Sequence, residues 1–233
     1  MMAVYNSDSM ANNLNLTQTI YCQLKEEIFA LRLIPGEKLS EMKIAAQYNC
    51  SRIPVREAFR QLCMEGCLES RPQIGSFVTL IDRVRLEQIR YVRECLETRV
   101  MVDGMREGCF YPLLDKLQEI VNTQALLYKN REYAHLHRLD NDFHNLFYEA
   151  AEKDFVRDYM GIENADYARA RFISLKYDNE PELLIQQHQD IVDAVRKNDE
   201  EKLCSAMRAH LNNLYRVLPI CPVSVRAYFT LPL

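Results

Sequence analysis

Residues 83–220 contain only three glycines and carry apolar side chains at helical spacing along most of their length. Apolar residues three and four apart indicate amphipathic helices, and no segment of this half is patterned clearly as a strand. We expect helices near residues 83–107, 112–130, 133–151, 154–176, 181–197 and 199–217. Pro112 and Pro181 fall at expected helix starts, where proline is tolerated. This half is therefore predicted to be an all-α antiparallel helical bundle.

The preceding residues have a different pattern. Helical spacing is clear from residue 16 to about residue 33, where a Pro-Gly pair breaks the helix. Ser40 and Ser51 are placed to cap two short helices, and the second of these should stop at Gly66. A longer helix followed by two short helices around a tight turn predicts a helix-turn-helix.

Two short strands are expected directly after this unit, around a turn that contains Pro72 and Gly75. Such a hairpin is the wing of a winged helix, and Gly75 allows its backbone to approach a phosphate closely. The expected organisation has four parts: a disordered tail (1–15), a winged helix-turn-helix (16–82), a helical effector domain (83–220) and a C-terminal tail (221–233).

Three arginines form a row on the second short helix. Arg52, Arg56 and Arg60 recur every four residues, and arginines near a helix N-terminus suit phosphates and guanine edges in the major groove. A solvated face with local ion pairs explains the charges equally well, because residues 1–82 hold eight Lys or Arg against nine Asp or Glu. The predicted wing is what favours DNA binding.

Four side chains in the second half share helix faces with core residues: Asp140, His144, His188 and His210. An aspartate and a histidine one turn apart can bind one metal ion, and two histidines from other helices would complete the site. A divalent ion would also relieve the cost of burying the carboxylate. Hydrogen-bonded core histidines are the alternative, and the pattern alone leaves both interpretations open.

The first half resembles the DNA-binding domain of the GntR family. The residues that carry the resemblance are Pro35-Gly36-Glu37-Lys38-Leu39-Ser40-Glu41, Ile44-Ala45, Ser51-Arg52-Ile53-Pro54-Val55-Arg56-Glu57-Ala58, Leu62 to Gly66, and Gly75-Ser76-Phe77-Val78. The match departs at Ile53 and Phe59, where the family usually has Thr and Leu. This resemblance implies that Ser51, Arg52, Arg56 and Gly75 contact DNA.

The second half resembles the FCD effector domain of the FadR-type branch. The resemblance lies in Leu139-Asp140-x-x-Phe143-His144, His188-x-x-Ile191-Val192-x-Ala194 and His210-Leu211. It implies that Asp140 and the three histidines hold a divalent cation, with zinc favoured over nickel or manganese. Arg93 matches an arginine of the first effector helix that would clamp a carboxylate; its alternative role is an ion pair with Glu97. His135 and His137 match nothing and are expected at the surface.

The resemblances imply a homodimeric transcriptional regulator, in the first instance a repressor, and not an enzyme. It would bind a palindromic operator in double-stranded DNA and respond to a small carboxylate effector. A regulator that senses the metal ion itself is one alternative. A metal-dependent hydrolase is the other, although the sequence holds no H-E-x-x-H motif.

The remaining features concern the environment of the chain. It holds neither a run of about 18 apolar residues nor a signal-like N-terminus, so we expect a soluble, cytoplasmic protein without a membrane partner. Its eight cysteines fall mostly among apolar residues, as small buried side chains do in a reducing compartment. Cys63 and Cys67 are expected four residues apart on one helix, where a thiol switch or a soft-metal site is conceivable.

Overall fold

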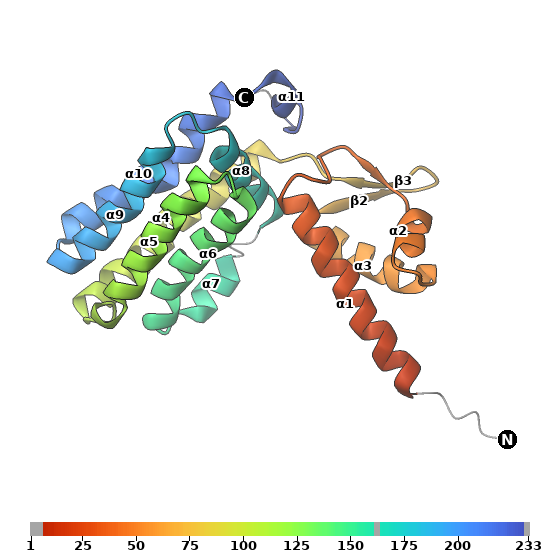
Figure 1. The fold of residues 1–233 in the computed structure, drawn as a ribbon, viewed down its shortest axis with the longest axis horizontal. Coiled ribbons are helices and arrows are strands. Elements are labelled where there is room, and N and C mark those ends of the chain that lie inside the picture. Colours follow the sequence, from red (N-terminus) through yellow and green to blue (C-terminus); the bar gives the residue numbers. More distant parts are fainter. Residues whose placement is uncertain (1–6, 161–163, 231–233) are drawn as a thin grey trace. The chain divides into compact units, whose positions relative to one another are not determined.

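The structure, a computed structural model, describes residues 7–160 and 164–230 (Figure 1). The chain divides into two compact units. The first unit comprises Met1–Ile81 together with Asn164–Arg169, and the second comprises Asp82–Glu163 and Ala170–Leu233. The short segment 164–169 therefore belongs to the unit that contains the helix-turn-helix, although it is distant from that unit in sequence.

The first unit is a winged helix with three helices and a small antiparallel sheet. Its elements are α1 (Ser7–Phe29), β1 (Lys38–Leu39), α2 (Glu41–Gln47), α3 (Arg52–Met64), β2 (Leu68–Arg71) and β3 (Gly75–Val78). The strand order is β1-β3-β2, so the predicted hairpin gains a third strand on its β3 edge. The first helix begins at Ser7, within the segment expected to be a disordered tail.

The core of the first unit follows from helical spacing on α1 and α3. Every fourth residue from Ile20 to Ile28 on α1 is buried. These side chains pack with the apolar face of α3, and together the two helices contribute Ile20, Leu24, Ile28, Val55, Ala58, Phe59 and Leu62 to the core. Ser40 caps α2 as expected, because its Oγ accepts a hydrogen bond from the N–H of Lys43 at 3.4 Å.

Cys67 lies beyond the end of α3, so the expectation that Cys63 and Cys67 share a helix was wrong. Burial raises the pKa of both thiols, which disfavours their thiolate form.

Arg169 is a fully buried charge in the first unit. It pairs with Asp166 at 2.9 Å and donates to the Ala165 carbonyl at 2.8 Å and to the Thr79 Oγ1 at 3.1 Å. Ala165 itself belongs to the apolar core of this unit. The ion pair lies within segment 164–169 itself. The segment is held to the rest of the unit by the hydrogen bond from Arg169 to Thr79 and by the apolar packing of Ala165.

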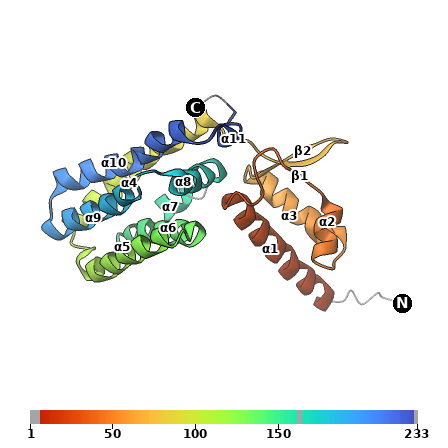
Figure 2. The same cartoon turned by 45° about the horizontal axis from the view of Figure 1, so that its top comes forward.

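The second unit is a bundle of helices that lie side by side (Figure 2). Its elements are α4 (Arg83–Arg106), η1 (Tyr111–Leu113), α5 (Leu114–Lys129), α6 (Tyr133–Ala150), α7 (Asp154–Met160), most of α8 (Ala165–Tyr177), α9 (Pro181–Lys197), α10 (Glu200–Val217), η2 (Leu218–Ile220) and α11 (Val223–Arg226). Helix α10 packs against α4 and α9, while α5 packs against α6 and α9. Among the described helices, none is both long and apolar enough to cross a membrane.

Two parts of this unit differ from expectation. The single helix expected at 154–176 is divided into α7 and α8, and residues 161–163 between them lie outside the described part of the chain. Helix α8 has its own start signal, because the Asn164 Oδ1 accepts the backbone N–H of Asp166 at 2.9 Å. After residue 220, where a tail was expected, α11 and the following turn bury Val225 and Phe229.

Candidate metal centre and DNA-binding surface

The bundle brings Asp140, His144, His188 and His210 together in its interior. Asp140 and His144 lie one turn apart on α6, while His188 comes from α9 and His210 from α10. All four side chains are buried, and their ligand atoms lie within 4.8 Å of one another. A buried group of one carboxylate and three imidazoles is a donor set that a divalent transition-metal ion prefers.

The distances within the cluster fit a shared ion. The Nε2 atoms of His144 and His210 face each other at 3.0 Å, and the His188 Nε2 lies 3.2 Å from the Asp140 Oδ1. Zinc bonds to imidazole nitrogen and carboxylate oxygen are about 2.0–2.2 Å long, so each of these pairs can contact one ion.

Two further residues contact the Nδ1 atoms of His144 and His188 and so orient these two rings. Glu97 on α4 contacts the His144 Nδ1 through its Oε1, and the Gln124 Oε1 on α5 lies 2.7 Å from the His188 Nδ1. A carboxylate only accepts hydrogen bonds, so His144 carries its proton on Nδ1 and presents the Nε2 lone pair to the cluster. The same tautomer of His188 follows if Gln124 accepts through its carbonyl oxygen. The sequence analysis missed both roles; Glu97 was named only as a partner of Arg93, and nothing in the sequence marks Gln124.

The pKa shifts within the cluster favour the binding of a metal ion. Burial, and then neighbouring histidines and arginines, hold the pKa of His188 and of His210 well below the usual value. Both imidazoles are therefore neutral near pH 7 and keep a lone pair for an ion. Burial raises the pKa of Glu97, but the charge of Arg93 and the contact with His144 outweigh it and lower this pKa to about 2. Glu97 thus stays an anion behind His144.

Two arginines flank the cluster. Arg93 pairs with Glu97 at 2.7 Å, and both side chains are 1% exposed. This is the ion pair that the sequence analysis gave as the alternative to a pocket role. Arg171 on α8, which the sequence analysis did not single out, contacts Asp140 of the cluster and donates to the Asn141 Oδ1 at 2.7 Å.

The other two histidines of α6 occupy different environments. His135 is exposed and pairs with Glu132 at 2.8 Å, as a surface residue would. His137 is buried, and its ring lies edge-on to Phe172 of α8 with the centroids 6.2 Å apart. The expectation that His137 lies at the surface was wrong, because α8 covers that side of α6.

On α3 the arginine row is exposed at the surface. Arg52 is exposed, while Arg56 donates from Nε to the Glu41 Oε2 at 2.8 Å and Arg60 pairs with Glu57 at 3.0 Å. The Arg60–Glu57 pair is local to α3, as the sequence pattern allowed, whereas the partner of Arg56, Glu41, lies on α2. The Arg56–Glu41 pair holds the guanidinium in place at the surface. Ser51, at the start of this helix, is exposed and makes no side-chain cap hydrogen bond.

The wing adds cations that the sequence analysis did not single out. Gly75 has a φ of +132°, a conformation that L side chains rarely adopt, and the Lys38 side chain lies against the position a Cβ would take. Arg71 lies over the ring of Phe77, with its guanidinium carbon 4.4 Å from the ring centroid. Gly75 is therefore bordered by positive charge, as a backbone that approaches phosphate requires.

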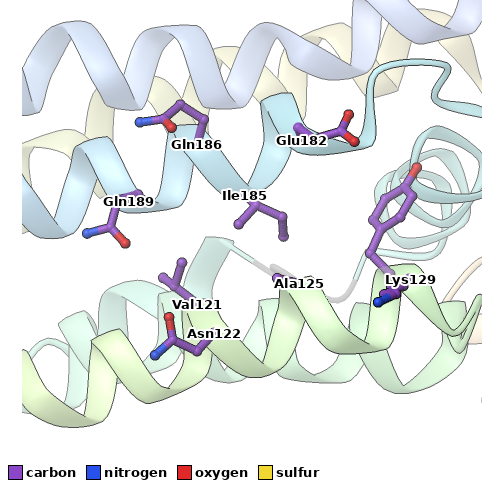
Figure 3. Close-up of a pocket in the computed structure, with 9 residues that line it drawn as sticks. Val121, Asn122, Ala125, Lys129, Glu182, Ile185, Gln186 and Gln189 are labelled. Atoms are coloured by element: carbon purple, nitrogen blue, oxygen red, sulfur yellow. The ribbon is translucent and has the colours of Figure 1, made fainter.

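A groove of about 510 Å³ lies between α5 and α9 of the bundle (Figure 3). Ile185 and Val121 give it an apolar floor, and Gln186, Gln189 and Asn122 supply amide groups. Its lining does not include any of the four clustered residues.

A winged helix with exposed arginines, joined to a helical domain that buries a metal-type cluster, defines a DNA-binding transcriptional regulator with a ligand-binding domain. The chain belongs to the GntR family and carries an FCD domain. Residues 16–78 match the model of the bacterial regulatory proteins of the gntR family, and residues 88–213 match the FCD domain. FCD domains are associated with metal binding, and the buried cluster could hold such an ion.

Individual relatives agree with this assignment. The chain is 30% identical over 202 residues to the HTH-type transcriptional repressor RspR of Escherichia coli K12, which covers 85% of this chain and 87% of the relative. It is 25% identical to the Nta operon transcriptional regulator of Aminobacter aminovorans, over 84% and 91% of the two chains. Among solved structures, E. coli McbR/YncC shares the fold with a TM-score of 0.70 and 20% identity, over 86% of this chain and 97% of that one.

Proposed function

We propose that this regulator is a repressor whose operator affinity is set by a small organic acid. The acid binds at a divalent ion, zinc in preference to nickel or manganese, held by Asp140, His144, His188 and His210. The observation that carries the proposal is the buried cluster itself, whose neutral imidazoles and orienting partners suit a bound cation. When bound, the ion supplies a positive charge that attracts a carboxylate, and Arg93 supplies a second cationic group beside it.

On the DNA side, α3 enters the major groove and the wing contacts the adjacent backbone. Arg52 and Arg56 contact base edges or phosphates, Ser51 contacts a phosphate at the helix start, and Gly75 lets the wing approach the backbone. Two copies of the chain form a homodimer in the cytoplasm and bind a palindromic operator, since two-fold symmetry in the protein is matched by two half-sites. RspR, a relative of similar length, is itself named a repressor.

The acid acts only through a difference in its affinity for the DNA-bound and DNA-free protein. The test is operator binding by fluorescence anisotropy, with DNA selected by the wild-type protein from a random library. We expect one member of a panel of small carboxylates to change the dissociation constant by about 5–150-fold, the usual range of allosteric coupling. Prior removal of the metal should abolish the effect. A response to metal without any acid would instead identify the ion as the effector.

Arg52→Ala and Arg56→Ala should each weaken binding to the selected DNA by about 1–3 kcal/mol, because each removes a contact of the recognition helix. Arg32→Ala is the matched control: Arg32 is a partly exposed arginine of the same unit, paired with Glu27 at 2.8 Å. Anisotropy titrations at one fixed salt concentration measure all three variants. Full operator affinity in both α3 variants would mean that this helix is not the recognition surface.

A further inference from the structure

The charges buried around the cluster limit the kind of acid that can bind there. Four charged side chains meet at this point: Arg93, Glu97, Asp140 and Arg171. Each is at most 7% exposed. Imidazoles that coordinate an ion are neutral, so these two positive and two negative side chains balance, and a bound divalent ion adds two positive charges. Buried charge of one sign is costly, so the loaded site favours anions.

The two guanidinium groups act on the same small region. Arg171 reaches the cluster through its contact with Asp140, and Arg93 reaches it through Glu97, which contacts the His144 Nδ1. Positive charge therefore faces the cluster from α4 and from α8, and the ion would add to it at the centre.

We propose that the effector is a dianion, a small dicarboxylate whose two acid groups balance the two positive charges left over when the ion is bound. This inference rests on the proposed function and narrows its ligand class. A monocarboxylate would leave one buried positive charge without compensation. Arg171 takes part in this selection as a specificity-determining residue, because its loss would remove one of the charges that the second carboxylate balances.

The test compares diacids with their half-amides, which have nearly the same size but one charge fewer. Malonate, succinate, glutarate and malate, each with its half-amide, are titrated into the full-length, zinc-loaded protein by calorimetry. We expect at least one diacid to bind about 10–100-fold more tightly than its half-amide, the range expected for hydrogen bonds to a charged group. Equal affinity within every pair would overturn the dianion proposal while leaving an organic-acid sensor intact. No binding by any acid would overturn both proposals.

Arg171→Gln provides a second readout. In this variant the affinities for the diacid and its half-amide should differ by no more than a few-fold. Lys176→Gln, at an exposed position on the same helix, should keep the wild-type ratio of the two affinities. Metal content by mass spectrometry shows whether the variant keeps its ion, because Arg171 contacts Asp140. If the variant holds zinc and keeps the full preference for the diacid, Arg171 is not the selective group. If the variant loses zinc, the ratio of diacid to half-amide affinity in the wild-type protein is the result that decides the proposal.

Discussion

Replacing His144 with alanine is expected to weaken zinc binding by more than about 100-fold, because changes to the partners of a ligand alone typically cost 10–100-fold. The substitution removes one of four ligand atoms and also leaves Glu97 without the imidazole that it orients. The affinity is measured by competition with a chromophoric chelator, after the protein has been stripped of metal. The same preparation is analysed for bound metal by mass spectrometry.

The thermal stability of the protein should report the same loss. An ion present at about 1,000 times its dissociation constant adds roughly 4.1 kcal/mol to the free energy of unfolding. For a chain of this size that raises Tm by about 2–4 °C per kcal/mol, and His144→Ala should lack the increase. His135→Ala on the same helix is the matched control, because His135 is exposed and pairs with Glu132 at the surface. Stoichiometric zinc of unchanged affinity in His144→Ala would show that the ligand set is wrong.

The inward direction of the four clustered residues could be predicted from sequence because each shares a helix face with core residues. Periodicity fixes which side of one helix a residue occupies. It does not fix which residues of two different helices meet, and the orienting contacts depend on that. Gln124 and His188 are 64 residues apart, and Glu97 reaches His144 from another helix. Arg171 was missed for the same reason, since its contact with Asp140 joins α8 to α6.

The fold was predictable where elements are long and regular. The winged helix and the bundle followed from helical spacing, caps and turn residues, and they agree with the structure. Strand β1 has only two residues, too few to show alternation, so the third strand was not predicted. The division of the helix expected at 154–176 depends on a cap at Asn164, a polar residue that also occurs within helices. The placement of segment 164–169 with the first unit is a tertiary property that no local pattern encodes.

The placement of segment 164–169 in the first unit predicts that its buried Arg169 contributes to stability. Arg169→Met should lower the stability of the first unit by about 3–5 kcal/mol, the usual cost of removing one partner of a buried ion pair. Methionine keeps much of the apolar volume but removes the group that pairs with Asp166 and donates to the Thr79 Oγ1. Native-state hydrogen exchange of the α1 and α3 amides measures the change, because the most protected amides report the opening of the whole unit.

Arg60→Met in the same unit is the control that separates the effect of burial on stability from the effect of losing a charge. Arg60 also pairs with a carboxylate three residues away, Glu57, but its side chain is 62% exposed, whereas that of Arg169 is 0% exposed. Exposed pairs contribute about 0–1 kcal/mol, so Arg60→Met should change the exchange rates little. Arg169→Lys should fall between the two, because it keeps the charge near Asp166 but cannot bond Thr79 and Ala165 together as the guanidinium does. If Arg169→Met proves as stable as Arg60→Met, segment 164–169 is held by the apolar packing of Ala165 alone, and the hydrogen bond from Arg169 to Thr79 contributes nothing to its position.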